Sequence, residues 1–161
     1  MIFRLTQKLS KKLGIAQLRT LPEDKNPYTD WTAHLFTVLR VQYVILTNTA
    51  SLYSMVLYGR GMSNDKNFTQ TVLTYMREFM AADGNRSIFE KYIETVANEV
   101  SFSKITDRRV IGSMNDFIFQ AKVHIIRLHQ SPFHVSLLLN ESPMSYLKYG
   151  CPKDAFGALS S

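Results

Sequence analysis

Hydrophobic and polar residues alternate along this chain with two periods, and each period predicts one kind of element. A period of two marks a strand with one buried face, and steps of three and four mark a helix with one buried side. Residues 2–5 predict a short strand, and Thr6 can cap a helix over residues 7–13 that stops at Gly14. Prolines, asparagine and aspartates then predict an irregular connector over residues 15–30.

Three segments rich in β-branched and aromatic residues follow, and they predict strands joined by tight turns. These segments are Trp31–Leu39, Tyr43–Thr47 and Leu52–Tyr58. The middle one is apolar on both faces, so we expect it to lie inside a sheet with cover on both sides. Val100–Ile105 predicts a further strand.

Helical spacing dominates the second half of the chain. Asn64 or Asp65 can cap a helix that ends at Gly84, and the pattern Ser87–Glu90 is that of a capping box at the start of the next helix.

Two Ser-Pro pairs predict short closing helices, because each places a capping residue before a proline in the first helical position. The pairs are Ser131-Pro132 and Ser142-Pro143, with the second helix ending near Gly150 and a last turn over residues 154–159. This order of elements predicts one α+β domain over residues 1–161, with helices packed on a small antiparallel or mixed sheet.

The stretch from Thr106 to Arg127 predicts the longest helix, spanning about residues 107–129, and it separates into two rows. The apolar row is Val110, Met114, Phe117, Ala121, Ile125 and Leu128. The polar row is Arg109, Ser113, Asp116, Gln120, His124 and Arg127.

The polar row is either a solvated face or the wall of a site. In a covered site, Arg109 would keep Asp116 ionised and His124 would exchange a proton. Ser113 lacks the surroundings of a hydrolytic nucleophile. Gly112, which is unfavourable inside a helix, would be explained by a close backbone approach or a kink.

Apolar residues on the flank of this helix predict that it is buried on most sides and leaves only a narrow polar groove. They are Ile111, Phe119, Val123 and Ile126.

The turn Thr47–Ser51 offers a second candidate site. Asn48 and its hydroxyl-bearing neighbours can bind a small polar ligand, but the same side chains also favour a β-turn by bonding to nearby backbone. The turn is the favoured interpretation.

The charge balance permits an anionic partner. The chain has 19 Lys and Arg residues against 13 Asp and Glu, a net charge of +6, without a block of like charges. A nucleic-acid surface would draw on Lys8, Lys11, Lys12, Arg19, Arg108 and Arg109.

Several classes of site have no signature in the sequence. No phosphate-binding glycine loop is present, and His124, His129 and His134 recur at five-residue steps that do not share a helix face. We therefore predict no metal and no cofactor. Cys151 is alone and no apolar run would span a bilayer, so we expect a cytoplasmic protein without a membrane partner.

Five segments in this order resemble a family of small uncharacterised bacterial proteins, classed as a domain of unknown function. They are the opening Ile-Phe-Arg-Leu-Thr-Gln-Lys-Leu, Trp31 with Leu35-Phe36, Leu46-Thr47-Asn48-Thr49, Arg109-Val-Ile-Gly-Ser-Met-Asn-Asp116, and Asn140-Glu-Ser-Pro-Met144. The resemblance implies a bacterial cytoplasmic protein and no particular activity. It singles out Arg109, Gly112, Ser113, Asn115 and Asp116.

We therefore expect a binding protein whose partner, protein or nucleic acid, meets the polar row and the turn at Asn48. The binding residues would be Arg109, Ser113, Asn115, Asp116, Gln120 and Asn48. The alternatives are a small hydrolase or transferase that uses Asp116 and His124 as acid and base, or a nucleic-acid-binding protein.

Overall fold

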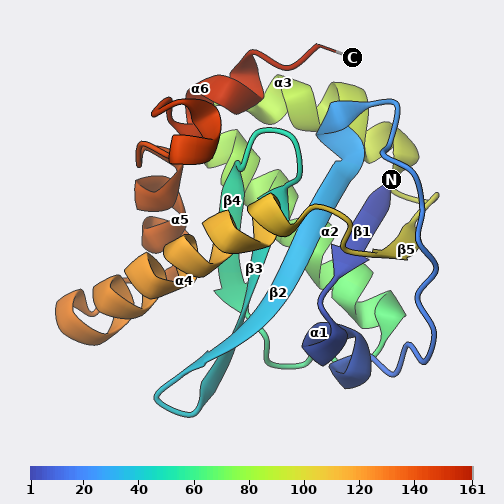
Figure 1. Ribbon diagram of the computed structural model, residues 1–161, viewed down its shortest axis with the longest axis horizontal. Helices are drawn as coiled ribbons and strands as arrows, with labels where there is room; N and C mark the ends of the chain where they lie inside the picture. The colour runs from blue at the N-terminus through green and yellow to red at the C-terminus, as the bar shows by residue number, and fades with distance from the viewer. Residues whose placement is uncertain (161) are drawn as a thin grey trace.

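A computed structural model describes residues 1–160 and shows a five-stranded mixed sheet with helices on both faces (Figure 1). The strand order is β4-β3-β2-β1-β5. The strands are β1 (Ile2–Leu5), β2 (Asp30–Val38), β3 (Val41–Asn48), β4 (Ser54–Tyr58) and β5 (Ser101–Lys104). β1 runs parallel to β2 and β5, whereas β2, β3 and β4 form an antiparallel meander. The α+β fold predicted from the sequence is confirmed.

The helices connect and cover these strands. They are α1 (Gln7–Lys12), α2 (Asp65–Ala82), α3 (Arg86–Ile88), α4 (Arg108–Leu128), α5 (Pro132–Asn140) and α6 (Pro152–Gly157). Short 3-10 turns lie at Pro27–Thr29, Glu94–Val96 and Ser145–Leu147, and a π-helical turn lies at Phe89–Ile93. None of the helices within residues 1–160 is both long enough and apolar enough to cross a bilayer.

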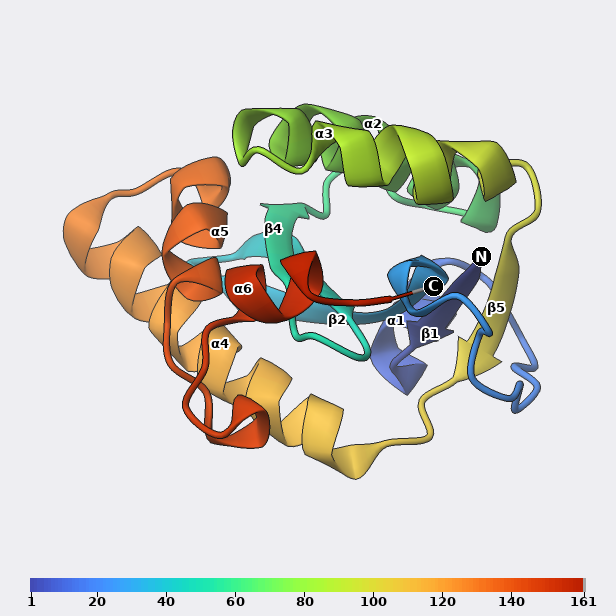
Figure 2. The same cartoon turned by 90° about the horizontal axis from the view of Figure 1, so that it is seen from above.

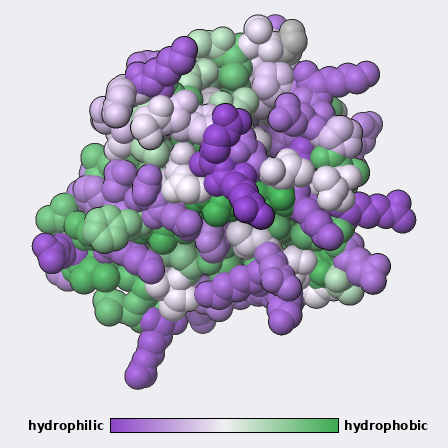
Figure 3. Space-filling model, in the orientation of Figure 1, coloured by the Kyte–Doolittle hydropathy of each residue, from purple (hydrophilic) through white to green (hydrophobic). Residues whose placement is uncertain are grey.

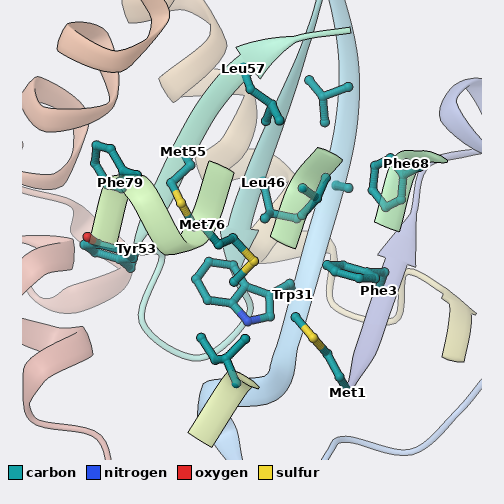
Figure 4. Packing of buried hydrophobic residues seen from close by; sticks show 14 of the residues in the cluster. Met1, Phe3, Trp31, Leu46, Tyr53, Met55, Leu57, Phe68, Met76 and Phe79 are labelled. Carbon is teal, nitrogen blue, oxygen red and sulfur yellow. The ribbon is translucent and has the colours of Figure 1, made fainter. Parts of the chain in front are cut away.

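Helices α2 and α4 lie on opposite sides of the sheet (Figure 2), and a hydrophobic cluster lies on each face. On the α2 face, Trp31 is fully buried among Phe3, Leu46 and Met76 (Figure 4). On the other face, α4 and α5 pack against residues such as Ile45. Successive residues of β3 alternate between the two clusters, which confirms that this strand is covered on both sides.

Helix α5 lies along the edge strand β4 and bonds to its free backbone groups. The Asn140 side chain accepts from the Ser54 amide at 2.7 Å and donates to the Ser54 carbonyl at 2.8 Å. The Ser136 hydroxyl accepts from the Val56 amide at 2.8 Å, and the Tyr75 hydroxyl donates to the Val56 carbonyl at 2.8 Å. An edge strand with unpaired backbone groups invites pairing with another chain, so this arrangement closes the edge over these residues.

Two helix starts predicted from the sequence are wrong. The helix predicted to follow a Ser87 cap starts at Arg86 instead, two residues earlier, and no side chain caps it. No helix starts at Ser142-Pro143, because the Ser142 hydroxyl donates back to the Leu138 carbonyl and closes the end of α5 instead. The last helix, α6, starts after Cys151.

Candidate functional site

Helix α4 is held on the sheet by its inner side. The Asp107 carboxylate caps its first turn by accepting from the Arg109 amide at 2.8 Å. The inner side chains, all buried against the sheet and α5, are Val110, Met114, Phe117, Ile118 and Ala121. Burial of this row fixes the direction in which every other side chain of α4 points.

The residues of the predicted polar row do not share one environment. Asp116 is exposed, and so is Asn115 beside it. Gln120 is half-buried, and its side-chain oxygen accepts from the Ser142 hydroxyl at 3.1 Å. Ser113 is buried, and its hydroxyl donates to the Arg109 carbonyl one turn back at 3.1 Å.

Arg109 pairs with Asp107 instead of Asp116. Its guanidinium donates to the Asp107 carboxylate at 3.0 and 3.2 Å and lies over the ring of Tyr146. The hydrogen bonds from Arg109 lower the pKa of the Asp107 carboxyl below its ordinary value. The expected pair of Arg109 and Asp116 is wrong, because seven residues of helix separate the two Cα atoms by about 10 Å along the axis.

Asp116 and His124 are also too far apart to exchange a proton directly. Eight residues correspond to about 12 Å along the axis. The His124 ring is half-buried, and its Nδ1 has no hydrogen-bond partner within residues 1–160. The structure therefore brings no acid and base together on this helix. Nor does any group of His, Cys, Asp and Glu within the described residues form a metal site.

The prediction that α4 is buried on most sides is wrong. Phe119 is 71% exposed and Ile126 is 43% exposed, because the sheet and α5 cover only the inner side. Figure 3 shows the resulting apolar patch at the left of the molecule, over the C-terminal half of α4. Gly112 lies on the exposed side, and a Cβ atom there would meet nothing within 4 Å. No close approach within the described residues explains this glycine.

The Asn48 side chain is buried inside the turn that precedes β4. It donates to the Pro27 carbonyl at 2.8 Å and accepts from the Ser51 amide and hydroxyl at 3.0 and 2.8 Å. These bonds are the local turn chemistry that the sequence favours.

Two buried polar clusters were missed by sequence reasoning. Arg4, 1% exposed, donates two hydrogen bonds to Asp30, 4% exposed, at 2.7 and 2.8 Å. Side chains alternate along β1, so Arg4 points to the other face of the sheet from Phe3. Arg4 is buried there because the connector before β2 passes over it, and carbonyls of that connector also accept hydrogen bonds from Arg4.

In the second cluster, the buried Asp83 carboxylate accepts from the Tyr53 hydroxyl at 2.7 Å and from Lys153 at 2.6 Å. Burial raises the pKa of Tyr53. These bonds fasten α6 to α2 and to the start of β4, so the cluster is structural.

The basic residues predicted to form one nucleic-acid surface are divided between two places. Lys12 donates to the Gln42 side chain on β3, whereas the backbone of Arg19 forms an isolated β-bridge with Ser103 on β5. Three strand positions, about 14 Å, separate β3 from β5.

Comparison with known proteins assigns the family but no activity. No curated protein and no solved structure matches the chain. A family model matches residues 2–155, nearly the whole sequence, including α4 and the strands beneath it. The chain therefore belongs to the family described as a domain of unknown function, DUF6933.

Proposed function

We propose that the protein is a binding protein that engages a partner protein through the outer face of α4. This α4 outer face consists of Asn115, Asp116, Phe119, Val123 and Ile126, which lie within about 100° of one another around the helix. The observation that carries the proposal is the exposure of Phe119 and Ile126 on a helix that is otherwise well packed.

An exposed phenylalanine with an exposed isoleucine two turns further along the same face is a favourable anchor for a partner. Covering a side chain of this size contributes about 2 kcal/mol, which corresponds to about a thirtyfold change in Kd. Aromatic anchors surrounded by polar residues are typical of the energetic centre of protein interfaces.

The polar neighbours supply direction to such a contact. Asn115 and Asp116 present an amide and a carboxylate at the N-terminal side of the apolar patch, and Gln120 borders it. Gly112 lies on the same side of the helix, where the missing side chain leaves room for a partner's backbone. Arg109 lies at the margin. Ser113 and Asn48 are buried, so they support the scaffold and are not part of the proposed contact.

Affinity purification of the tagged protein from its own cells tests the proposal. A partner should be retained by the wild type and lost from the double variant Phe119→Ser, Ile126→Ser. Leu39→Ser is the matched control, because Leu39 is 75% exposed but lies at the turn between β2 and β3. Equal recovery of every bound protein with the double variant would contradict the proposal.

A further inference from the structure

A basic groove lies beside the end of the β2–β3 hairpin, far from the α4 outer face along the chain. Lys12, Arg40 and Arg60 line it together with Gln42 and Tyr58, and its volume is about 780 Å³. None of the described residues that line it is acidic. Two further lysines, Lys8 and Lys11, are exposed on α1, the helix that supplies Lys12.

The groove is assembled from segments distant in sequence. Lys12 reaches across from α1 to bond with Gln42 on β3, which joins one wall to the other. Arg40 occupies the hairpin turn with a φ of 67°, a left-handed conformation that Asn and Gly adopt more easily than a long side chain. The turn therefore holds a cation where its backbone chemistry favours a small residue.

Tyr58 gives the groove an aromatic surface. Tyr58 is 54% exposed, and its ring centroid lies 5.3 Å from that of Tyr43, which in turn stacks on Phe36 at a centroid distance of 5.5 Å. The three residues are cross-strand neighbours on β4, β3 and β2. Two buried rings thus support one exposed ring, which makes Tyr58 a rigid platform for a planar ligand.

An apolar hollow of about 330 Å³ borders Tyr58 as well. Tyr75, Phe133 and Pro132 line it, and Tyr58 belongs to both spaces. Glu78 lines a neighbouring hollow together with Tyr75, whereas no acidic residue is among the described residues that line the basic groove.

We infer that the basic groove and the apolar hollow bind single-stranded nucleic acid. Phosphates would be held by Lys12, Arg40 and Arg60, and bases would stack on Tyr58 and enter the aromatic hollow. A positively charged groove interleaved with aromatic rings is the arrangement that holds unpaired bases. In a duplex the base faces are stacked on one another and cannot occupy such a hollow.

Fluorescence anisotropy with labelled dT12, U12 and a 12-base-pair duplex tests the inference. The wild type should bind one or both single strands more tightly than the duplex, and the two single-stranded probes separate DNA from RNA as the ligand. Three phosphate contacts predict a slope of log K against log salt of about −2, because each contact to a single strand contributes about −0.7.

Matched variants separate the groove from general basicity. Arg40→Ala with Arg60→Ala should reduce the slope to about −0.7, whereas Arg19→Ala with Arg108→Ala removes the same charge outside the groove and should leave it unchanged. Tyr58→Ala should weaken binding about tenfold and Tyr58→Phe should not. Tyr149→Ala is the control for Tyr58→Ala, since Tyr149 is 77% exposed elsewhere.

Three results would overturn the inference: no binding of either single strand, with or without binding to anionic phosphatidylserine vesicles, equal affinity for the duplex, or an unchanged affinity of Tyr58→Ala. Thermal unfolding followed by circular dichroism should show that the variants remain folded, since the replaced side chains are exposed.

Discussion

Helices α4 and α5 are neighbours that both carry polar residues at helical spacing, yet the polar residues compared below are buried on α5 and exposed on α4. On α5, Ser136 and Asn140 are fully buried and bonded to the edge strand β4. On α4, Asn115 and Asp116 face outward beside an exposed phenylalanine. The difference lies in what each side faces: α5 packs against unpaired backbone groups of β4, whereas most of the α4 outer face is exposed.

The comparison separates polar residues that stabilise the fold from those free to bind. A buried polar side chain whose partner is removed leaves a donor or acceptor without water, at a cost of about 1–3 kcal/mol for each group. An exposed polar side chain keeps its water when it is replaced, so its loss is small.

The largest expected effect is at the buried ion pair of Arg4 and Asp30. Arg4→Ala should lower the free energy of unfolding by about 4 kcal/mol, because it leaves a buried carboxylate without its partner. Urea unfolding measures the loss, and Arg127→Ala, at an exposed arginine of α4, is the control.

The double variant Arg4→Met, Asp30→Leu should recover part of that stability, because neither charge remains buried. A loss below about 1 kcal/mol for Arg4→Ala would mean that water reaches the ion pair. The expectation that removing the partner of a buried polar group is costly would then be wrong for this pair.

Asn140 and Asn115 allow the same substitution on the two sides of the comparison. Asn140→Ala should cost about 3 kcal/mol, since the amide and carbonyl of Ser54 both lose their partner. Asn115→Ala should change stability by less than about 0.5 kcal/mol. Chemical denaturation of both variants measures the difference, and equal effects would show that α5 does not close the edge of the sheet.

Gly112→Ala should stabilise the protein by about 1 kcal/mol, because alanine is the better helix former and its Cβ meets no neighbour. If a partner's backbone approaches Gly112, the same variant should bind that partner more weakly. Denaturant unfolding checks the first expectation. A loss of stability would instead indicate a close approach that the described residues do not contain.

The smallest effect concerns the N-cap of α4. The pKa of Asp107 is lowered in the folded protein, so its stabilising contribution is present above the unfolded pKa of about 4. It is lost as the pH falls through the lower, folded pKa. Asp107→Asn keeps a capping side chain but no charge, so its difference in Tm from the wild type should shrink below about pH 4. A constant difference would mean that Arg109 does not interact with the Asp107 charge.

The sequence predicts the elements of this fold better than their surroundings. The strands, the span of α4 and most of its inner row follow from local periodicity and capping, whereas Leu128, predicted to belong to that row, is 57% exposed at the end of the helix. The burial of Arg4 and the exposure of Phe119 depend on what crosses over each residue from elsewhere in the chain. Local periodicity contains no information about which distant segments cover a given residue.

The candidate site shows the same limit. The residues of the polar row do lie on one helix, as predicted, but Ser113 and Gln120 lie at the border between this row and the packed face. Ser113 donates a hydrogen bond to a carbonyl of the same helix, and Gln120 accepts one from the loop after α5. Lys12 lies 28 residues before Arg40, and Arg40 lies 20 residues before Arg60, so only the fold brings them to one groove.

Calorimetric titration of the purified partner against the wild type and Phe119→Ser tests the proposed binding of a partner protein to the α4 outer face. Kd should rise about thirtyfold for Phe119→Ser, while Leu39→Ser binds as the wild type does. An unchanged Kd for Phe119→Ser, with the helix still folded, would contradict it.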